Sequence, residues 1–177
     1  SNKADWASLL VQQATQEGEV THVRRVLHHR QHRICAPIAA SPAVLNGDTP
    51  SVTVIIPTRN RVDLLRTCLE GVASTAYPRL DVIVVDNGSD DPETIDYLAA
   101  LEVSHIRVLR HPGPFNYSTI NNRAAREAQG HLLCLLNNDI EVTSPDWLSI
   151  MATQAIRGDV GAVHIGVGHD DDLVIAQ

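Results

Sequence analysis

The sequence is poor in the residues that mark several classes of protein. It has three cysteines, Cys35, Cys68 and Cys134, at no close spacing, and an odd number argues against a disulfide framework. Lys and Arg number 14 against 21 Asp and Glu, and the resulting net charge of −7 disfavours a nucleic-acid partner. An anionic small ligand remains compatible with this charge, because local groups set its site.

Long apolar runs and glycine-rich loops are also missing. No stretch approaches the roughly 18 consecutive apolar residues of a membrane span, and no secretory signal peptide is recognisable. Together with the cysteine usage, this favours a reducing compartment, which we take to be the cytoplasm. Neither G-x-G-x-x-G nor G-x-x-x-x-G-K follows the first strand-like run, so a bound nucleotide would need another means of offsetting its diphosphate charge.

What the chain does contain is an alternation of two hydrophobic patterns. Short buried-strand patterns alternate with helical spacing, such as that of Val62, Leu65 and Leu69. Asp91 suits the N-cap of one helix, and Gly130 suits the end of another. The patterns predict strands at 51–57, 80–86, 104–109, 131–136 and 160–163, and helices at 61–74, 92–101, 116–130 and 144–158.

Strands that are apolar on both faces and separated by helices indicate an α/β fold, with a mainly parallel sheet and helices on both faces. The first fifty residues differ from this pattern. Residues 1–36 combine one amphipathic helix with two short strand-like runs, which makes a small α+β appendage. Residues 37–50 are rich in Pro, Ala and Ser and resemble a linker. We therefore predict an appendage at 1–36, a linker at 37–50 and an α/β domain at 51–177.

Polar residues follow four of the predicted strands, at the points where the strands end. They lie at 57–60, 86–91, 110–116 and 137–139. The carboxyl ends of parallel strands share one edge of a sheet, which is where open α/β sheets bind ligands. One such segment means little, because turns favour these residues anyway, but four together predict a polar ligand site.

Asp139 ends the last of these segments, where an apolar run gives way to Asn137, Asn138 and Asp139. Mg²⁺ and Mn²⁺ prefer hard oxygen ligands, and their nucleotide sites often use only one or two carboxylates. We predict that Asp139 holds Mn²⁺ or Mg²⁺, which would neutralise a bound diphosphate. The plainer alternative is a carboxylate that caps a turn.

Several ordered segments resemble the nucleotide-binding half of family 2 glycosyltransferases, which have the Rossmann-like GT-A fold. They are VTVIIPTRNRVDLLRTCLEGV, DVIVVDNGSDD, AREAQGHLLCLLNNDIEV and SPDWLSIM. The O-antigen and rhamnan-type enzymes also have counterparts of PGPFNYSTINN. The resemblance covers residues 51–163 and implies a truncated GT-A domain. The stretch 1–36 is similar to the closing segment of a preceding GT-A domain of the same family.

The resemblance implies roles for individual residues. Pro57, Thr58 and Arg59 would line the nucleoside pocket, and Asp86 would contact the base or ribose. Three further positions match a donor-side asparagine, a ribose contact and the metal ligand: Asn122, Asn138 and Asp139. Many relatives have acids at most positions of the motif that NND occupies, so weaker or more substrate-dependent cation binding is expected.

These roles imply an inverting glycosyltransferase that moves a sugar from a nucleotide-diphospho-sugar to a polysaccharide or glycolipid acceptor. In the family a further half with a catalytic base follows, and the resemblance assigns no base to this chain. The aspartates at 170–172 are expected to form a solvated loop. We expect the chain to bind nucleotide without turnover, in the cytoplasm or peripherally at the inner face of the membrane. Its oligomeric state stays open.

Two other classes fit part of the sequence. One is a non-catalytic GT-A-like module that binds a ligand or mediates assembly. The other is a nucleotidyltransferase, which shares the sheet type but would need a glycine-rich signature that PTRNRVD lacks. The segment with Phe115 and Tyr117 also has two interpretations: it lines a ligand pocket, or it fills a core in a chain with only 3% aromatic residues.

Overall fold

The computed structural model describes residues 49–102, 106–158, 160–167 and 171–176. The predicted appendage at 1–36 and nearly all of the linker at 37–50 lie outside these residues. The described residues form β1 (Val52–Thr58), α2 (Val62–Ala73), β2 (Leu80–Asp86), α3 (Pro92–Glu102), β3 (Arg107–Arg110), α4 (Tyr117–Glu127), β4 (Leu132–Leu135), α5 (Trp147–Ala155), β5 (Ala162–Val167) and β6 (Asp171–Ala176). Within these ranges no helix has the length and apolar character needed to cross a lipid bilayer.

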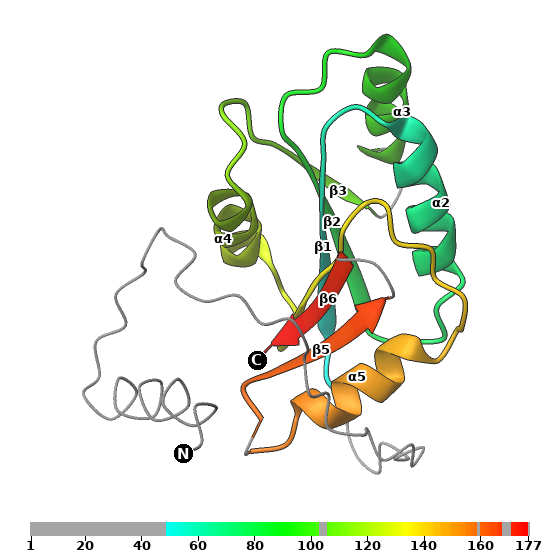
Figure 1. The fold of residues 1–177 in the computed structure, drawn as a ribbon, viewed down its shortest axis with the longest axis vertical. Coiled ribbons are helices and arrows are strands. Elements are labelled where there is room, and N and C mark those ends of the chain that lie inside the picture. The colour runs from blue at the N-terminus through cyan, green and yellow to red at the C-terminus, as the bar shows by residue number, and fades with distance from the viewer. Residues whose placement is uncertain (1–48, 103–105, 159, 168–170, 177) are drawn as a thin grey trace, which may run out of the picture. The chain divides into compact units, whose positions relative to one another are not determined.

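The sheet has the order β3-β2-β1-β4-β6-β5, and its first four strands are parallel (Figure 1). Thr58 lies in register with Asp86, and Asp86 lies in register with Arg110, so β1, β2 and β3 end at one level. β4 is shorter and ends at Leu135, opposite Ile55. The prediction of a mainly parallel sheet is therefore confirmed, with the strand ends that matter for the site at one edge.

The last two strands depart from the prediction. The strand expected at 160–163 is β5, but it pairs antiparallel with β6, which in turn pairs antiparallel with β4. Asp171 and Asp172 begin β6 instead of lying in a solvated loop, and Asp170 lies outside the described residues. The reason is that the backbone groups along the edge of β4 need partners, which β6 supplies.

Helices cover both faces of the sheet, as the sequence predicts. One face packs against α4, through a small core of Ile55, Ile83, Val85, Ile120 and Ala124. The other face packs against α2, α3 and α5 around a larger core that includes β1 residues such as Val54 and Ile56 (Figure 1). This two-sided covering explains why the strands are apolar on both faces.

The ends of the helices agree only in part with those predicted from the sequence. Asp91 is the N-cap of α3, as predicted, and its carboxylate accepts a hydrogen bond from the Thr94 amide at 2.9 Å. α4 ends at Glu127, so Gly130 does not close it. α5 covers only Trp147–Ala155 of the predicted 144–158. Its N-cap is Asp146, two residues after Ser144, and its C-cap is Ile156. The Ser144 hydroxyl donates to the Asp146 carboxylate.

Candidate functional site

A cavity of about 270 Å³ lies beyond the carboxyl ends of β1, β2 and β4. Four of the seven predicted site residues line it: Pro57, Thr58, Arg59 and Asn138. The other lining residues are Arg61, Leu64, Asn87 and Phe115. The wall thus combines apolar surface with hydroxyl, amide and guanidinium groups, which is the mixture expected of a site for a polar organic ligand.

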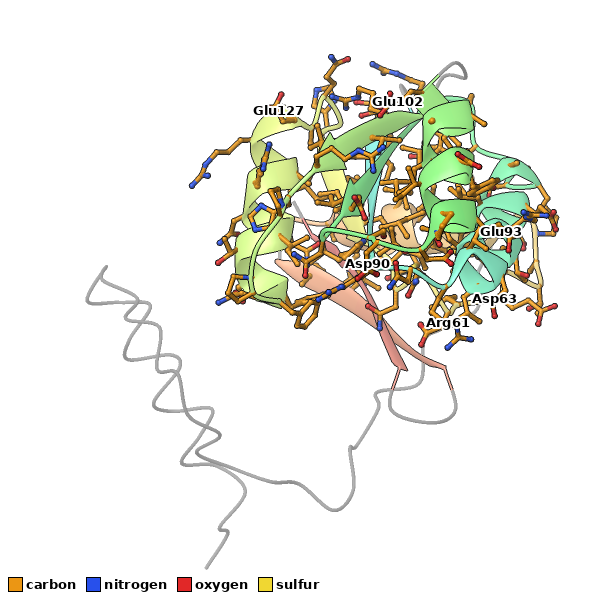
Figure 2. All side chains as sticks on the ribbon, turned by 90° about the horizontal axis from the view of Figure 1, so that it is seen from above. Arg61, Asp63, Asp90, Glu93, Glu102 and Glu127 are labelled. Atoms are coloured by element: carbon orange, nitrogen blue, oxygen red, sulfur yellow. The ribbon has the colours of Figure 1, made fainter. Side chains whose placement is uncertain are left out.

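The orientation of the helices identifies this edge of the domain in Figure 2. Arg61, Asp63 and Asp90, which precede or begin helices, lie toward one edge of the view. Glu102 and Glu127, the last residues of α3 and α4, lie toward the opposite edge. Helices that connect parallel strands run back along the sheet, so their first turns surround the carboxyl ends of the strands.

Asn60 holds the loop that follows β1. Its backbone amide donates to the Ser89 hydroxyl at 2.8 Å, and its side-chain amide donates to the Asp90 carboxylate at 2.8 Å. Its side-chain oxygen accepts from the amides of Asp90 and Asp91. These bonds stabilise left-handed backbone at two consecutive residues, Asn60 and Arg61, both with φ of 54°. The loop that carries Arg59 and Arg61 is therefore tied to the loop that follows β2.

Thr58 joins three strand ends at the cavity wall. Its hydroxyl accepts a hydrogen bond from the Asn138 side-chain amide at 3.2 Å, and its carbonyl accepts from the Asn87 amide at 2.8 Å. Thr58 is only 4% exposed, so these bonds form where water competes little. Residues from the ends of β1, β2 and β4 are thereby held together at one point, although Asn138 is 80 residues away from Thr58.

Asp86 lies beside the cavity but is not part of its lining. One carboxylate oxygen accepts from the Ser89 amide and hydroxyl, at 2.9 and 2.5 Å. The other oxygen accepts from the guanidinium of Arg110 at 2.9 Å. The side chain is almost fully buried, and a buried carboxylate needs such partners. Its clearest role in this structure is to join the ends of β2 and β3.

Asp139 and Asn122 also lie outside the lining. Asp139 is exposed in the turn after β4, and Asn122 is exposed on α4. The Asp139 carboxylate is close enough to Cys68 and Arg61 to raise the pKa of both side chains. Burial raises the pKa of Cys68 to about 12, and the negative charge of Asp139 adds to this shift. The pKa of Arg61 is raised mainly by its hydrogen bond and ion pair with Asp63, with a smaller contribution from Asp139.

The donor set near Asp139 suits a cation that arrives with phosphate. Among the described residues no group of three His, Cys, Asp or Glu side chains could hold a metal alone. Mg²⁺ and Mn²⁺ sites often use one or two carboxylates and complete their coordination with phosphate oxygens and water. A single exposed carboxylate beside a polar cavity fits that arrangement and does not fit a preformed protein cage.

Three of the lining residues, Arg61, Leu64 and Asn87, were missed by the sequence prediction. Arg61 directly follows the polar segment 57–60 and Asn87 lies within the polar segment 86–91, so their position after a strand end was a usable signal. Leu64 carried no such signal, because it belongs to a helix whose apolar residues were expected to face the core. Phe115 was left open between pocket and core, and the structure places it in the cavity wall, 67% exposed.

A mainly parallel sheet with a polar cavity beyond its strand ends defines an α/β domain with a candidate ligand site at that edge. The family model described as glycosyl transferase family 2 matches residues 53–174. The match covers well over half of the chain, and the protein belongs to this family. It is 46% identical over 116 residues to O-antigen biosynthesis protein RfbC of Myxococcus xanthus, covering 65% of this chain and 9% of that protein. It is also 44% identical over 129 residues to the uncharacterised protein y4gI of Sinorhizobium fredii, covering 71% and 14%.

Solved structures give the same fold. The domain is similar to mannosyltransferase PcManGT from Pyrobaculum calidifontis in complex with GDP-Man and Mn²⁺, with a TM-score of 0.64 and 22% identity. That match covers 79% of this chain and 47% of the other. A second match is TarS residues 1–349 from S. aureus, with a TM-score of 0.51, 21% identity and coverage of 58% and 31%. The predicted GT-A fold is therefore confirmed. The chain spans only a small part of its curated relatives, and under half of the mannosyltransferase.

Proposed function

We propose that this chain is the donor-binding part of a glycosyltransferase that moves a sugar from a nucleotide-diphospho-sugar to a polysaccharide or glycolipid acceptor. The observation that supports this most directly is the cavity at the strand ends, lined by four residues predicted to bind the nucleotide. The family supports the transferase chemistry. The relative named for O-antigen biosynthesis supports a bacterial surface polysaccharide as the product.

The lining residues have the chemistry to bind a nucleoside diphosphate. The guanidinium group of Arg61 would offset phosphate charge, which this chain cannot do with a glycine-rich loop, and Arg59 would line the nucleoside pocket. Asn138 and Thr58 would meet ribose hydroxyls. The Asp86 carboxylate can accept a further hydrogen bond from an N–H or O–H group of the nucleoside. Each carboxylate oxygen accepts about two hydrogen bonds, and one of the two oxygens has Arg110 as its single partner.

Asp139 would hold the divalent cation, Mn²⁺ or Mg²⁺, that accompanies the donor. When bound, such a cation acts as a Lewis acid that stabilises charge on the leaving diphosphate. Within this chain, Arg61 would support the same charge from the cavity wall. The mannosyltransferase with this fold was solved with GDP-Man and Mn²⁺, which agrees with a cation-dependent donor site.

Inversion at the sugar carbon would require a base that deprotonates the acceptor hydroxyl. None of the described residues has been assigned this role. The expectation that this chain binds nucleotide without turnover stays a prediction, as does the cytoplasmic location. An assay for sugar transfer from UDP-, GDP- and dTDP-sugars would test the first of these.

Nucleotide binding tests the proposal directly. Calorimetric titration with UDP, GDP and dTDP, each with and without Mn²⁺, should show that at least one of them binds, and binds more tightly with Mn²⁺. Inorganic pyrophosphate with Mn²⁺ separates binding of the diphosphate from binding of the whole nucleotide. If none of the three nucleotides binds under either condition, the chain is better described as the non-catalytic module.

A further inference from the structure

Phe115 is the most exposed of the large apolar side chains that the structure describes. It is the single phenylalanine of the sequence, and 67% of it is exposed. The other exposed large apolar residues, between 38% and 45% exposed, are Ile95, Tyr117, Ile150 and Ile156. None of those four lines the cavity, whereas Phe115 does. A single exposed apolar side chain needs no explanation by itself, but an aromatic ring in the wall of a polar cavity is placed to contact a ligand.

The loop that carries Phe115 is held in place from both sides. Before it, the Asn87 side-chain amide donates to the carbonyl oxygens of His111 and Gly113, at 2.8 and 3.2 Å. After it, the Asn116 side chain caps α4 by accepting a hydrogen bond from the Thr119 amide at 2.9 Å. The ring is thus exposed but sits on a fixed backbone, and it can bind a ligand at a low cost in conformational entropy.

The two acceptors also determine the orientation of the Asn87 amide. Carbonyl oxygens only accept hydrogen bonds, so the group that faces His111 and Gly113 must be the NH₂. Asn87 is 2% exposed, and its own oxygen has no partner among the described residues. The side chain is therefore committed to the loop, and its burial beneath the cavity supports the position of Phe115.

The rest of the cavity favours a flat heteroaromatic ring. Arg59 is exposed in the wall and makes no hydrogen bond or ion pair with the described residues. Aromatic rings and guanidinium planes are the groups on which proteins stack nucleobases. The volume of about 270 Å³ is just below the range of roughly 300–1,000 Å³ for whole-ligand pockets. It therefore suits one part of a nucleotide sugar, and the Phe115 ring and the Arg59 guanidinium in its lining fit a base.

We propose that Phe115 is the platform on which the nucleobase of the donor stacks. This inference rests on the proposed function, because it assumes a nucleotide donor, and it assigns one part of that donor to one side chain. Stacking is tolerant of base identity, since every base has a π-face. Phe115 therefore contributes affinity for nucleosides in general and does not select one base.

The test compares Phe115→Leu with Tyr117→Leu as a matched control. Both variants remove an exposed aromatic ring from the same segment, but only Phe115 lines the cavity. With whichever of UDP, GDP or dTDP binds best, Phe115→Leu should weaken binding about tenfold, and Tyr117→Leu should change it by less than about twofold. Phe115→Trp should retain binding, and the nucleotide should quench its fluorescence more than that of the unchanged chain, which already has Trp6 and Trp147, whereas pyrophosphate should not.

The outcomes separate this inference from the proposed function. If the unchanged chain binds no nucleoside diphosphate, the proposed function fails and this inference fails with it. If it binds one and Phe115→Leu binds equally well, only the inference is overturned. A loss that also affects pyrophosphate would show a general disturbance of the site. A loss seen only with the sugar-bearing donor would place the ring against the sugar. Either result would overturn the stacking of the base.

Discussion

Single residues at the cavity edge adopt conformations that are costly without support from their surroundings. Asn60 and Arg61 both have left-handed backbone, which costs roughly 1–3 kcal/mol for a side chain such as arginine. Arg61 also occupies the N-cap of α2 without making a side-chain cap bond there. Strain of this kind persists only where the surrounding structure determines the conformation, as the hydrogen bonds of Asn60 do here, and it clusters at functional sites.

Asp139 is the residue at which the metal prediction can be tested. Asp139→Asn keeps the shape of the side chain but removes its charge, so the Mn²⁺-dependent part of nucleotide binding should fall about tenfold or more. Nucleotide binding without Mn²⁺ should be nearly unchanged. Calorimetric titration of the nucleotide in Mn²⁺ and in EDTA measures both quantities.

Glu141→Gln is the matched control for that change. Glu141 is an exposed acid two residues further along the same loop, so its substitution alters the net charge equally. It should leave the effect of Mn²⁺ intact. An equal loss in both variants would mean that overall charge, and not a ligand at Asp139, causes the cation dependence.

Between elements, a partly buried network ties the amino ends of the strands to the end of α4. The Thr53 hydroxyl donates to the Asp81 carboxylate at 2.9 Å and accepts from the Gly130 amide at 2.9 Å. Arg107 pairs with Asp81 and also donates to the carbonyl of Glu127, the last residue of α4. Gly130 therefore passes directly over β1, which is its structural role instead of closing the helix.

Gly130→Ala should destabilise the domain by about 1–3 kcal/mol. A Cβ atom there would overlap the backbone nitrogen of Thr53 and the backbone carbon of Val52, neither of which can move aside as a flexible side chain could. Gly158→Ala is the control, because a Cβ atom at that position meets no atom within 4 Å. Urea unfolding should show a lower midpoint for the first variant and a near-wild-type midpoint for the second. Equal midpoints would refute the close approach.

At alkaline pH the stability of the whole domain should depend on pH, because several buried or partly buried groups keep their protons in the folded state. Burial raises the pKa of Cys68 to about 12 and also raises the pKa of Cys134. Burial likewise raises the pKa of Tyr77, Tyr97 and Tyr117. Each group is neutral when protonated, so the folded state keeps protons that the unfolded chain releases.

The free energy of unfolding should therefore be insensitive to these groups below pH 9, the ordinary pKa of a thiol, and should fall as pH rises above it. For Cys68 the expected loss between pH 9 and 10 is about 1 kcal/mol. Cys68→Ser keeps a donor for the carbonyl of Asn137 but does not titrate in this range, so its pH dependence should be shallower. Urea unfolding at pH 8, 9 and 10 measures both slopes, and identical slopes would contradict the assignment to Cys68.

The order and type of the elements from β1 to β5 were predictable because they depend on local patterns. Apolar residues with helical spacing became the buried face of α2, and the short β-branched runs became parallel strands. The polar segments after the strands share an edge, as parallel strands require, and Asp91 caps α3 from its own sequence context. The domain boundaries and the nucleotide-binding and metal-binding roles implied for all seven site residues stay predictions.

By itself, then, the sequence determined the fold class, the family and the edge of the sheet where a ligand should bind. The fold class and the binding edge follow from neighbouring residues, whose spacing sets backbone conformation and burial, and the family follows from the resemblance of several ordered motifs. Tertiary structure alone decided which distant segments meet: the pairing of Asp86 with Arg110, the approach of Gly130 to β1 and the antiparallel pairing of β6 with β4. The physical reason is that such contacts join residues far apart in the chain, and strand register and packing decide them.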